Sequence, residues 1–286
     1  MIMNNRVSFS QLGNIGRLGN QFFQIAFTIA YAIRTNMDFH FPKWVYSKWM
    51  NKELPFGDFD KADVNSLVSF HYEPISLYPG KNVDLRDSHG QTEKYFKNQW
   101  EVIKPYLTIK DEYKEAIKYK YRGHLGHQKT CSIHIRLTDY TNPVNIDYHG
   151  MCSMDYYRKA IAEIYGDENP KDVLFMIFSD EISKAKEMFS LPNMYFVEPD
   201  DSIVPKMKEL SGLSIGNGDL MELFLMSYCK DNIIVNSSFS WWGAWLNENP
   251  NKRVVAPLHW FNQAPIDYKD VVPEGWIKID NRNLPK

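Results

Sequence analysis

The spacing of apolar residues predicts that the chain opens with a strand, a helix and a second strand. Residues 6–10 alternate weakly between polar and apolar positions, as in a short strand. From Phe22 to Ile33 the apolar residues recur at helical spacing, and the helix is expected to end near Asn36. Residues 39–41 resume a strand, so the opening segment is predicted to be a βαβ unit.

The second half of the chain alternates strand-like apolar runs with helical ones. The strands are expected at 132–135, 173–178, 194–197, 233–235 and 254–256, and the helices at 156–164, 183–189, 220–229 and 241–246. Strands that alternate with helices in this way predict a parallel sheet with helices on both faces. The predicted fold class is therefore α/β.

The middle of the chain indicates how it divides. Prolines interrupt the pattern over residues 44–100, as in long loops that carry binding residues. Residues 111–122 have a helical pattern, and a loop with two glycines and two histidines follows at 123–130. Because 286 residues exceed one ordinary core, we predict two domains, residues 1–125 and 126–286.

Composition narrows the class of protein. A hydrophobic content of 44% and a charged content of 24% are typical of a soluble globular protein, and no apolar run reaches the length of about 18 residues that a membrane helix needs. The formal net charge of -2 argues against a broad surface for nucleic acid or anionic membrane. Cys131, Cys152 and Cys229 lack the spacing of a metal or redox site, so we expect reduced thiols in a cytoplasmic protein.

A serine-rich turn follows the apolar run at 233–235 and leads into a tryptophan-rich helix. Ser237, Ser238 and Ser240 would place hydroxyls and backbone N–H groups at the helix N-terminus, where the helix dipole favours negative charge. Such a turn can hold a phosphate. The alternative is that the serines only cap the helix and the tryptophans only fill the core.

A second cluster of polar residues ends the strand at 132–135. His134 and Arg136 are two residues apart, hence on one face, and Asp139 follows in the loop where α/β proteins bind ligands. Arginine suits a diphosphate because its planar fork donates two parallel hydrogen bonds. The alternative is an ion pair between Arg136 and Asp139 that only fixes the loop.

Three further patterns each have a functional and a structural interpretation. Gly13, Gly16 and Gly19 would let the backbone approach a ligand, although turns use glycine routinely. Asp180 ends the strand at 173–178 and could accept two hydrogen bonds from guanine, or Ser179 or Asp180 could cap the next helix. The Asp-x-Asp pattern at 58–60 does not end an apolar strand, so we interpret it as a solvated turn rather than a metal site.

The run Asn236–Leu246, with Asp219-Leu220 and the Leu225–Cys229 segment before it, resembles the C-terminal motif of the bacterial α-1,2-fucosyltransferases. The resemblance implies a GT-B-like fold of two Rossmann-like domains that face a cleft. It also implies inverting transfer of L-fucose from GDP-β-L-fucose to the 2-hydroxyl of a terminal galactose, without a metal or other cofactor. The N-terminal domain would then bind the acceptor and the C-terminal domain the GDP-sugar.

The resemblance also assigns roles to residues. The segment Gly16–Gln21 is similar to the family's N-terminal motif, which implies donor binding by Gly19 and Asn20. His134, Arg136 and Asp139 match the motif His-x-Arg-Arg-x-Asp and are the candidate catalytic residues, with Asp139 the candidate base. The remaining donor-binding candidates are Asp180, Asn236, Ser237, Ser238, Phe239 and Ser240.

One departure from the motif leaves the activity open. Leu137 stands where the family has its second arginine, so a transferase that uses another GDP-sugar, or a non-catalytic nucleotide- or glycan-binding module, remains an alternative. The expected partners are GDP-fucose and a galactose-terminated glycan, with no nucleic acid. The resemblance also allows peripheral membrane association with a lipid-linked acceptor.

Overall fold

The computed structural model describes residues 5–57, 62–137, 150–166, 170–198, 218–262 and 265–282. The chain folds into two compact units. The first consists of Met1–Lys114 with Asp267–Pro273, and the second of Glu115–Ile266 with Glu274–Lys286. Each unit contains a parallel sheet, which confirms the α/β class. In the described part of the chain, no helix is both long and apolar enough to cross a bilayer.

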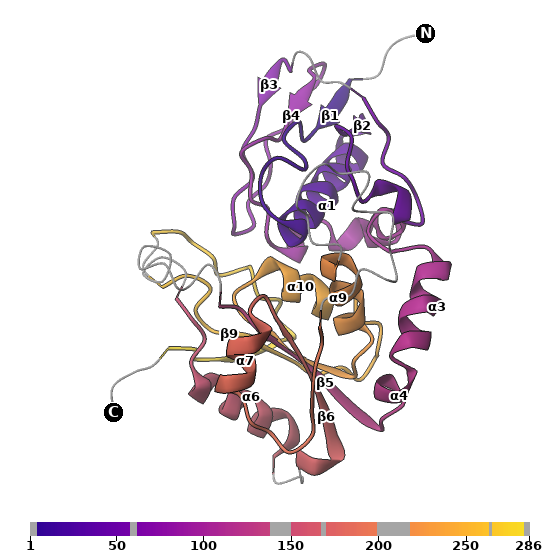
Figure 1. Cartoon of the computed structure of the whole chain (residues 1–286). Coiled ribbons are helices and arrows are strands. Elements are labelled where there is room, and N and C mark those ends of the chain that lie inside the picture. Colours follow the sequence, from indigo (N-terminus) through magenta and orange to yellow (C-terminus); the bar gives the residue numbers. More distant parts are fainter. Residues whose placement is uncertain are drawn as a thin grey trace. The chain divides into compact units, whose positions relative to one another are not determined.

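The first unit is built on the predicted βαβ segment. Its sheet has the order β2-β1-β4-β3 and all pairs are parallel (Figure 1). The strands are β1 (Arg6–Ser8), β2 (Asp38–His40), β3 (Val64–Asn65) and β4 (Val83–Asp84). Helix α1 (Leu18–Thr35) is buried along nearly its whole length and forms the centre of this core. It ends at Asn36, whose left-handed backbone lets its N–H bond to the carbonyls of Ala32 and Ile33.

The rest of the first unit consists mainly of loops and short helices. Its regular pieces are η1 (Ser47–Trp49), η2 (Glu93–Tyr95), η3 (Lys97–Gln99), α2 (Trp100–Ile103) and η4 (Lys104–Tyr106). Helix α3 (Asp111–Lys120) spans the point where the two units divide. The short helix α4 (Arg122–Leu125) follows, in place of the start of the loop expected at 123–130. Which unit binds the acceptor and which the donor stays a prediction.

The second unit has a doubly wound sheet with the strand order β10-β9-β8-β5-β6-β7. Its strands are β5 (Lys129–Ile135), β6 (Val173–Ser179), β7 (Met194–Phe196), β8 (Asp231–Ile233), β9 (Val254–Pro257) and β10 (Ile277–Ile279). The chain starts at the central strand β5, builds outward to β7, then crosses back and builds outward from β8 to β10. The direction of building therefore reverses between β5 and β8, which is where sheets of this kind bind ligands.

Helices cover both faces of this sheet, as the alternation predicts (Figure 1). Helices α6 (Met154–Tyr165) and α7 (Ile182–Met188) pack on the face formed by Cys131, Ile133 and Ile135. Helices α9 (Gly218–Ser227) and α10 (Ser238–Trp245) pack against each other on the opposite face. A short helix, η5 (Pro170–Asp172), precedes β6.

Strand β8 begins earlier in the sequence than predicted. The expected strand was 233–235, whereas β8 runs from Asp231 to Ile233. Its first residues are polar yet buried, because their side chains are satisfied inside the protein. Asn232 donates to Ser132 Oγ at 2.7 Å and to the carbonyl of Met226 at 2.9 Å, and these bonds connect β8 to both β5 and α9.

Asp231 anchors the same strand from its other side. The Tyr165 hydroxyl donates to Oδ2 of Asp231 at 3.0 Å, and Arg253 donates to both carboxylate oxygens at 3.2 and 2.8 Å. The Asp231 side chain is 6% exposed and that of Arg253 is 43% exposed. The cluster thus joins α6, β8 and the segment before β9 through one buried carboxylate.

We predict that Asp231→Ala lowers the free energy of unfolding by about 2 kcal/mol, since a broken buried pair costs more than an exposed one but half-exposed Arg253 regains water. Glu198→Ala is the control, because Glu198 contacts Lys186 at 2.6 Å while 59% exposed. Its loss should cost less than about 1 kcal/mol. Urea unfolding of both variants measures the difference, and equal losses would contradict the role of Asp231.

Candidate functional site

Three sequence-predicted segments meet at one edge of the second sheet. Strand β5 pairs with β8 on one side and with β6 on the other, and both pairs are parallel. The carboxyl ends of these strands therefore lie at the same edge. Arg136 follows β5, Asp180 follows β6, and the turn at residues 236–240 follows β8. The structure brings these predicted site residues together at the point where strand order reverses.

The serine turn places the N-terminus of α10 at this edge. Ser237 is the N-cap residue and has extended backbone angles, but its hydroxyl makes no capping hydrogen bond. Ser240 is buried, and its hydroxyl donates to the Ser237 carbonyl at 3.4 Å. The first N–H groups of a helix have no partner within the helix and carry its positive dipole end. Capping by Ser237 therefore does not explain this turn, which has the geometry of an anion site.

The tryptophans of α10 belong to the core, as the structural interpretation held. Trp241 and Trp242 are fully buried, and the rings of Trp241 and Trp245 stack at 5.3 Å. Gly243 permits close packing on α9, because a Cβ atom there would lie 2.9 Å from Cβ of Met226. The packing of α10 fixes the direction in which its N-terminus points.

His134 is buried at the end of β5 and lies next to the serine turn. It is 5% exposed, and its ring is 5.7 Å from that of Phe239. Burial, and to a smaller extent the nearby Arg136 charge, together lower the pKa of His134 to about 3, although the Asp180 carboxylate opposes the shift. Its Nδ1 atom makes no hydrogen bond to the described part of the chain. Because the imidazole stays neutral near pH 7, it can hydrogen-bond to a ligand but is not suited to take up the acceptor's proton.

Leu137 and Asp180 fix the backbone beside Arg136. The Leu137 N–H donates to Oδ1 of Asp180 at 2.8 Å. The Leu137 side chain is 5% exposed and belongs to the core cluster that also contains Ile135. The position of the family's second arginine therefore faces the core here, which accounts for an apolar residue at this place.

Asp180 does not cap the next helix. Helix α7 begins at Ile182, its N-cap residue is Glu181, and Glu181 makes no side-chain cap bond. The Ser179 hydroxyl instead accepts the N–H of Glu181 at 3.1 Å. The hydrogen bond from the Leu137 N–H to Asp180 holds the loop after β5, and recognition of guanine by Asp180 stays a prediction.

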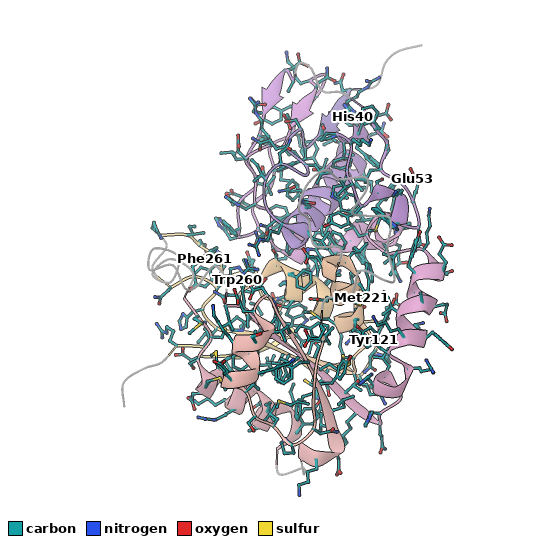
Figure 2. The ribbon with its side chains drawn as sticks, in the orientation of Figure 1. His40, Glu53, Tyr121, Met221, Trp260 and Phe261 are labelled. Carbon is teal, nitrogen blue, oxygen red and sulfur yellow. The ribbon has the colours of Figure 1, made fainter. Side chains whose placement is uncertain are left out.

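Glu222 joins this group, although the sequence reasoning missed it. Burial, together with the carboxylates of Asp219 and Asp180, raises its pKa to about 8. At neutral pH Glu222 is therefore mostly protonated and can both donate and accept a hydrogen bond. Tyr121 also interacts electrostatically with Glu222. Tyr121 and Met221, the residue before Glu222, are labelled in Figure 2. The available sequence signal was an acidic residue in the middle of a largely apolar helix, whose other acidic residue, Asp219, lies in the first turn.

Asn236 braces the chain segments around the serine turn. Its Nδ2 atom donates to the carbonyls of Gly150 at 3.1 Å and Trp260 at 3.2 Å, and the thiol of Cys152 donates to Oδ1 at 3.9 Å. Trp260 follows β9 and is labelled in Figure 2. These contacts give Asn236 a positioning role, and its direct contact with a donor stays a prediction.

The glycine loop of the first unit is held by the helix that it precedes. Gly16 has a φ of +74°, and a Cβ atom there would lie 2.6 Å from Cβ of Asn20. Gln21 donates to the Gly16 carbonyl at 2.9 Å. Asn20 accepts a hydrogen bond from Gln91 at 3.0 Å, and Gly19 is buried in the first turn of α1. Both predicted donor residues thus lie at a rigid corner between loop and helix.

Asp139 and the Asp-x-Asp segment at 58–60 lie outside the residues that the structure describes. Within the residues that the structure does describe, no three His, Cys, Asp or Glu side chains are arranged to hold a metal ion.

A doubly wound sheet with a helix N-terminus at its switch point is an arrangement that nucleotide-binding α/β proteins use, and sequence comparison defines the class of protein further. The chain belongs to glycosyl transferase family 11, whose model matches residues 15–280. This confirms the resemblance to the bacterial α-1,2-fucosyltransferase family and shows that the chain is a glycosyltransferase.

Two Escherichia coli proteins are among its relatives. The O-antigen biosynthesis glycosyltransferase WbnK is 39% identical over 152 residues, which cover 52% of this chain and 44% of that protein. An alpha-1,2-colitosyltransferase is 27% identical over 297 residues, which cover 93% of this chain and 97% of that protein. The first match therefore spans less than half of its relative, whereas the second spans nearly all of it.

Solved fucosyltransferase structures share the fold. NodZ from Bradyrhizobium matches with a TM-score of 0.52 and 13% identity over 85% of this chain and 93% of that one. A mutant of Arabidopsis thaliana FUT1 in complex with GDP matches with a TM-score of 0.52 and 12% identity over 88% of this chain and 70% of that one. The predicted GT-B-like class is confirmed.

We predict that Glu222→Gln changes how stability depends on pH. The folded pKa of about 8 lies above the ordinary value of 4.5, so the contribution of protonated Glu222 is complete below about pH 4.5 and is lost as the pH rises through 8. Glutamine does not ionise. The free energy of unfolding of the variant minus that of the parent should therefore rise between these values, by at most about 1.4 kcal/mol per pH unit.

Urea unfolding of both proteins at intervals from pH 4 to pH 9 measures this difference. If the difference stayed constant across the range, Glu222 would titrate like an exposed carboxyl group. Glu222 would then not be assigned to the candidate site.

Proposed function

We propose that the chain transfers L-fucose from GDP-β-L-fucose to the 2-hydroxyl of a terminal galactose, with inversion and without a metal ion. The observation that carries this proposal is the switch-point edge of the second unit. There Arg136 and the N-terminus of α10 follow two adjacent parallel strands, so a cation and the positive end of a helix dipole lie at one edge of the sheet. Family membership identifies the reaction as glycosyl transfer.

The chemistry requires positive charge at this edge. When the bond between the anomeric carbon and the β-phosphate oxygen breaks, its electron pair leaves with GDP and the sugar carbon becomes oxocarbenium-like. The acceptor oxygen attacks from the opposite face, and its proton passes to a base. Arg136 and the N–H groups at the start of α10 can stabilise the growing phosphate charge, a role that a metal ion would otherwise fill.

The proposal also names the base that takes the proton of the acceptor hydroxyl. The pKa of about 3 directs His134 toward orienting a ligand rather than accepting the proton. Asp139 stays the proposed base because it follows Arg136 closely in the sequence.

A second donor has specific support from the relatives. The alpha-1,2-colitosyltransferase matches almost the full length of this chain. Colitose differs from L-fucose by the absence of the 3-hydroxyl, so a site that reads this hydroxyl would discriminate between the two sugars. GDP-colitose is therefore the alternative donor.

The proposal is tested by incubating purified protein with GDP-fucose, GDP-colitose or GDP-mannose and a panel of galactose-terminated glycans. We expect GDP release and an α-1,2-linked fucosyl product, identified by NMR, with activity unchanged by EDTA. Faster turnover of GDP-colitose would change the donor, and binding without turnover would favour a non-catalytic module. Activity that EDTA abolishes and manganese restores would contradict the metal-free reaction.

We predict that Arg136→Lys lowers kcat by about 100-fold or more, the scale of one lost preorganised donor to an oxyanion, while the KM for donor changes much less. Lysine keeps the charge but loses the bidentate fork. Leu137 faces the core and offers no replacement guanidinium.

The control is Arg158→Lys, an exposed arginine on α6. Its kcat should match that of the parent. If kcat of a folded Arg136→Lys protein stayed within about threefold of the parent, the leaving-group role would move to the serine turn.

A further inference from the structure

A three-residue segment of the first unit is held rigidly although its side chains face solvent. We call His71, Tyr72 and Glu73 the 71–73 strip. The Tyr95 hydroxyl donates to the His71 carbonyl at 2.8 Å and accepts the N–H of Glu73 at 3.2 Å. The N–H of Tyr72 donates to Oδ2 of Asp270 at 2.8 Å. Three successive backbone groups are thus fixed by side chains from elsewhere in the sequence.

The support for the strip comes from a distant part of the chain. Asp270 belongs to Asp267–Pro273, the segment that rejoins the first unit after most of the second unit. Its side chain is 11% exposed, and its Oδ1 lies 2.6 Å from Nζ of Lys94. One carboxylate oxygen therefore contacts the lysine and the other holds the strip. Because Lys94 holds Asp270 in place, the hydrogen bond from Tyr72 to Asp270 restricts the movement of the strip.

The side chains that this support presents are an aromatic ring, an imidazole and two carboxylates. Tyr72 is 40% exposed, and its ring is 5.2 Å from that of Tyr95. The His71 ring lies between two carboxylates, at 3.8 Å from Glu73 and 3.9 Å from Asp267. The carboxylates are 52% and 41% exposed. The arrangement combines an apolar face with several hydrogen-bonding groups.

The carboxylates have neighbours but keep capacity for a ligand. The Ser69 hydroxyl donates to Glu73, and Lys269 donates to Asp267 at 2.7 Å. An ionised carboxylate has about four lone-pair positions, so both can accept further hydrogen bonds. Since no described trio of His, Cys, Asp or Glu is arranged for a metal ion, ligand hydroxyls are the better match.

The chemistry of the strip fits a neutral sugar. A pyranose has a face of C–H groups, which pack on an aromatic ring, and hydroxyls around its edge, which donate to carboxylates. A phosphate group fits poorly, because Glu73 and Asp267 would repel it. The cation beside them, Lys269, is already paired with Asp267, so charge disfavours the nucleotide end of a GDP-sugar here.

We propose that the 71–73 strip, together with Asp267, is a subsite for a neutral pyranose of the acceptor glycan. The identification of this sugar with the acceptor rests on the proposed function. Binding of the sugar itself does not, because the geometry of the strip lies entirely within the first unit.

The first test uses transfer kinetics with lactose as the varied acceptor. Tyr72→Ala should raise the KM for lactose by about 5- to 10-fold, the scale of one lost aromatic contact, while kcat and the KM for donor stay near those of the parent. Tyr72→Phe keeps the ring and should restore the parent KM. Tyr119→Ala is the matched control, because Tyr119 is 70% exposed and lies on α3 outside the strip.

The second test separates this proposal from the proposed function. Saturation-transfer NMR with lactose and no nucleotide sugar should show binding to the parent, to Tyr72→Phe and to Tyr119→Ala, and weaker binding to Tyr72→Ala. Absence of fucosyl transfer with this binding pattern intact would overturn the proposed function alone. Lactose that does not bind the parent, or binds Tyr72→Ala equally well, would overturn the subsite.

Discussion

The parallel pairing of β5 with β8 is the constraint on which the rest of the second unit depends. These strands are far apart in the sequence, and Asn232 joins them by donating to Ser132 while it also holds the carbonyl of Met226. Because the sheet is built outward in both directions from this pair, the loops that follow the two strands are not covered by a crossover connection. This single feature places both motifs at one edge of the sheet.

Side chains alternate along β5, so core residues lie on one face of the strand and candidate site residues on the other. Cys131, Ile133 and Ile135 enter the core under α6, and Leu137 continues the same row beyond the strand. His134 lies on the other face, against the turn that begins α10. An arginine in place of Leu137 would put its charge in the apolar core unless the loop changed course. In this chain Leu137 therefore packs in the core, and its backbone N–H rather than its side chain contacts Asp180 at the switch-point edge.

The sequence predicted local order well, because strand and helix periods are properties of neighbouring residues. The alternation in the second half gave the parallel sheet, and the spacing of His134 and Arg136 placed them at a strand end. It could not predict β4, which is two residues long, or the polar start of β8, since neither has an apolar run. Features that depend on distant partners were also missed, among them Glu222 and the contact of Lys94 with Asp270 across 176 positions.

Charge distinguishes the two proposed binding regions in a way that suits their ligands. The donor edge combines Arg136 with a helix N-terminus and therefore attracts a diphosphate, whereas Glu73 and Asp267 give the strip a negative character that a neutral sugar tolerates. Electrostatic attraction therefore stabilises a GDP-sugar at the donor edge, whereas repulsion destabilises it at the strip. A neutral acceptor is not attracted by charge at either region, so its shape and hydroxyls must provide recognition. The released GDP is more negative than the intact donor, so Glu73 and Asp267 repel it more strongly. This repulsion keeps the product from competing with the acceptor for the strip.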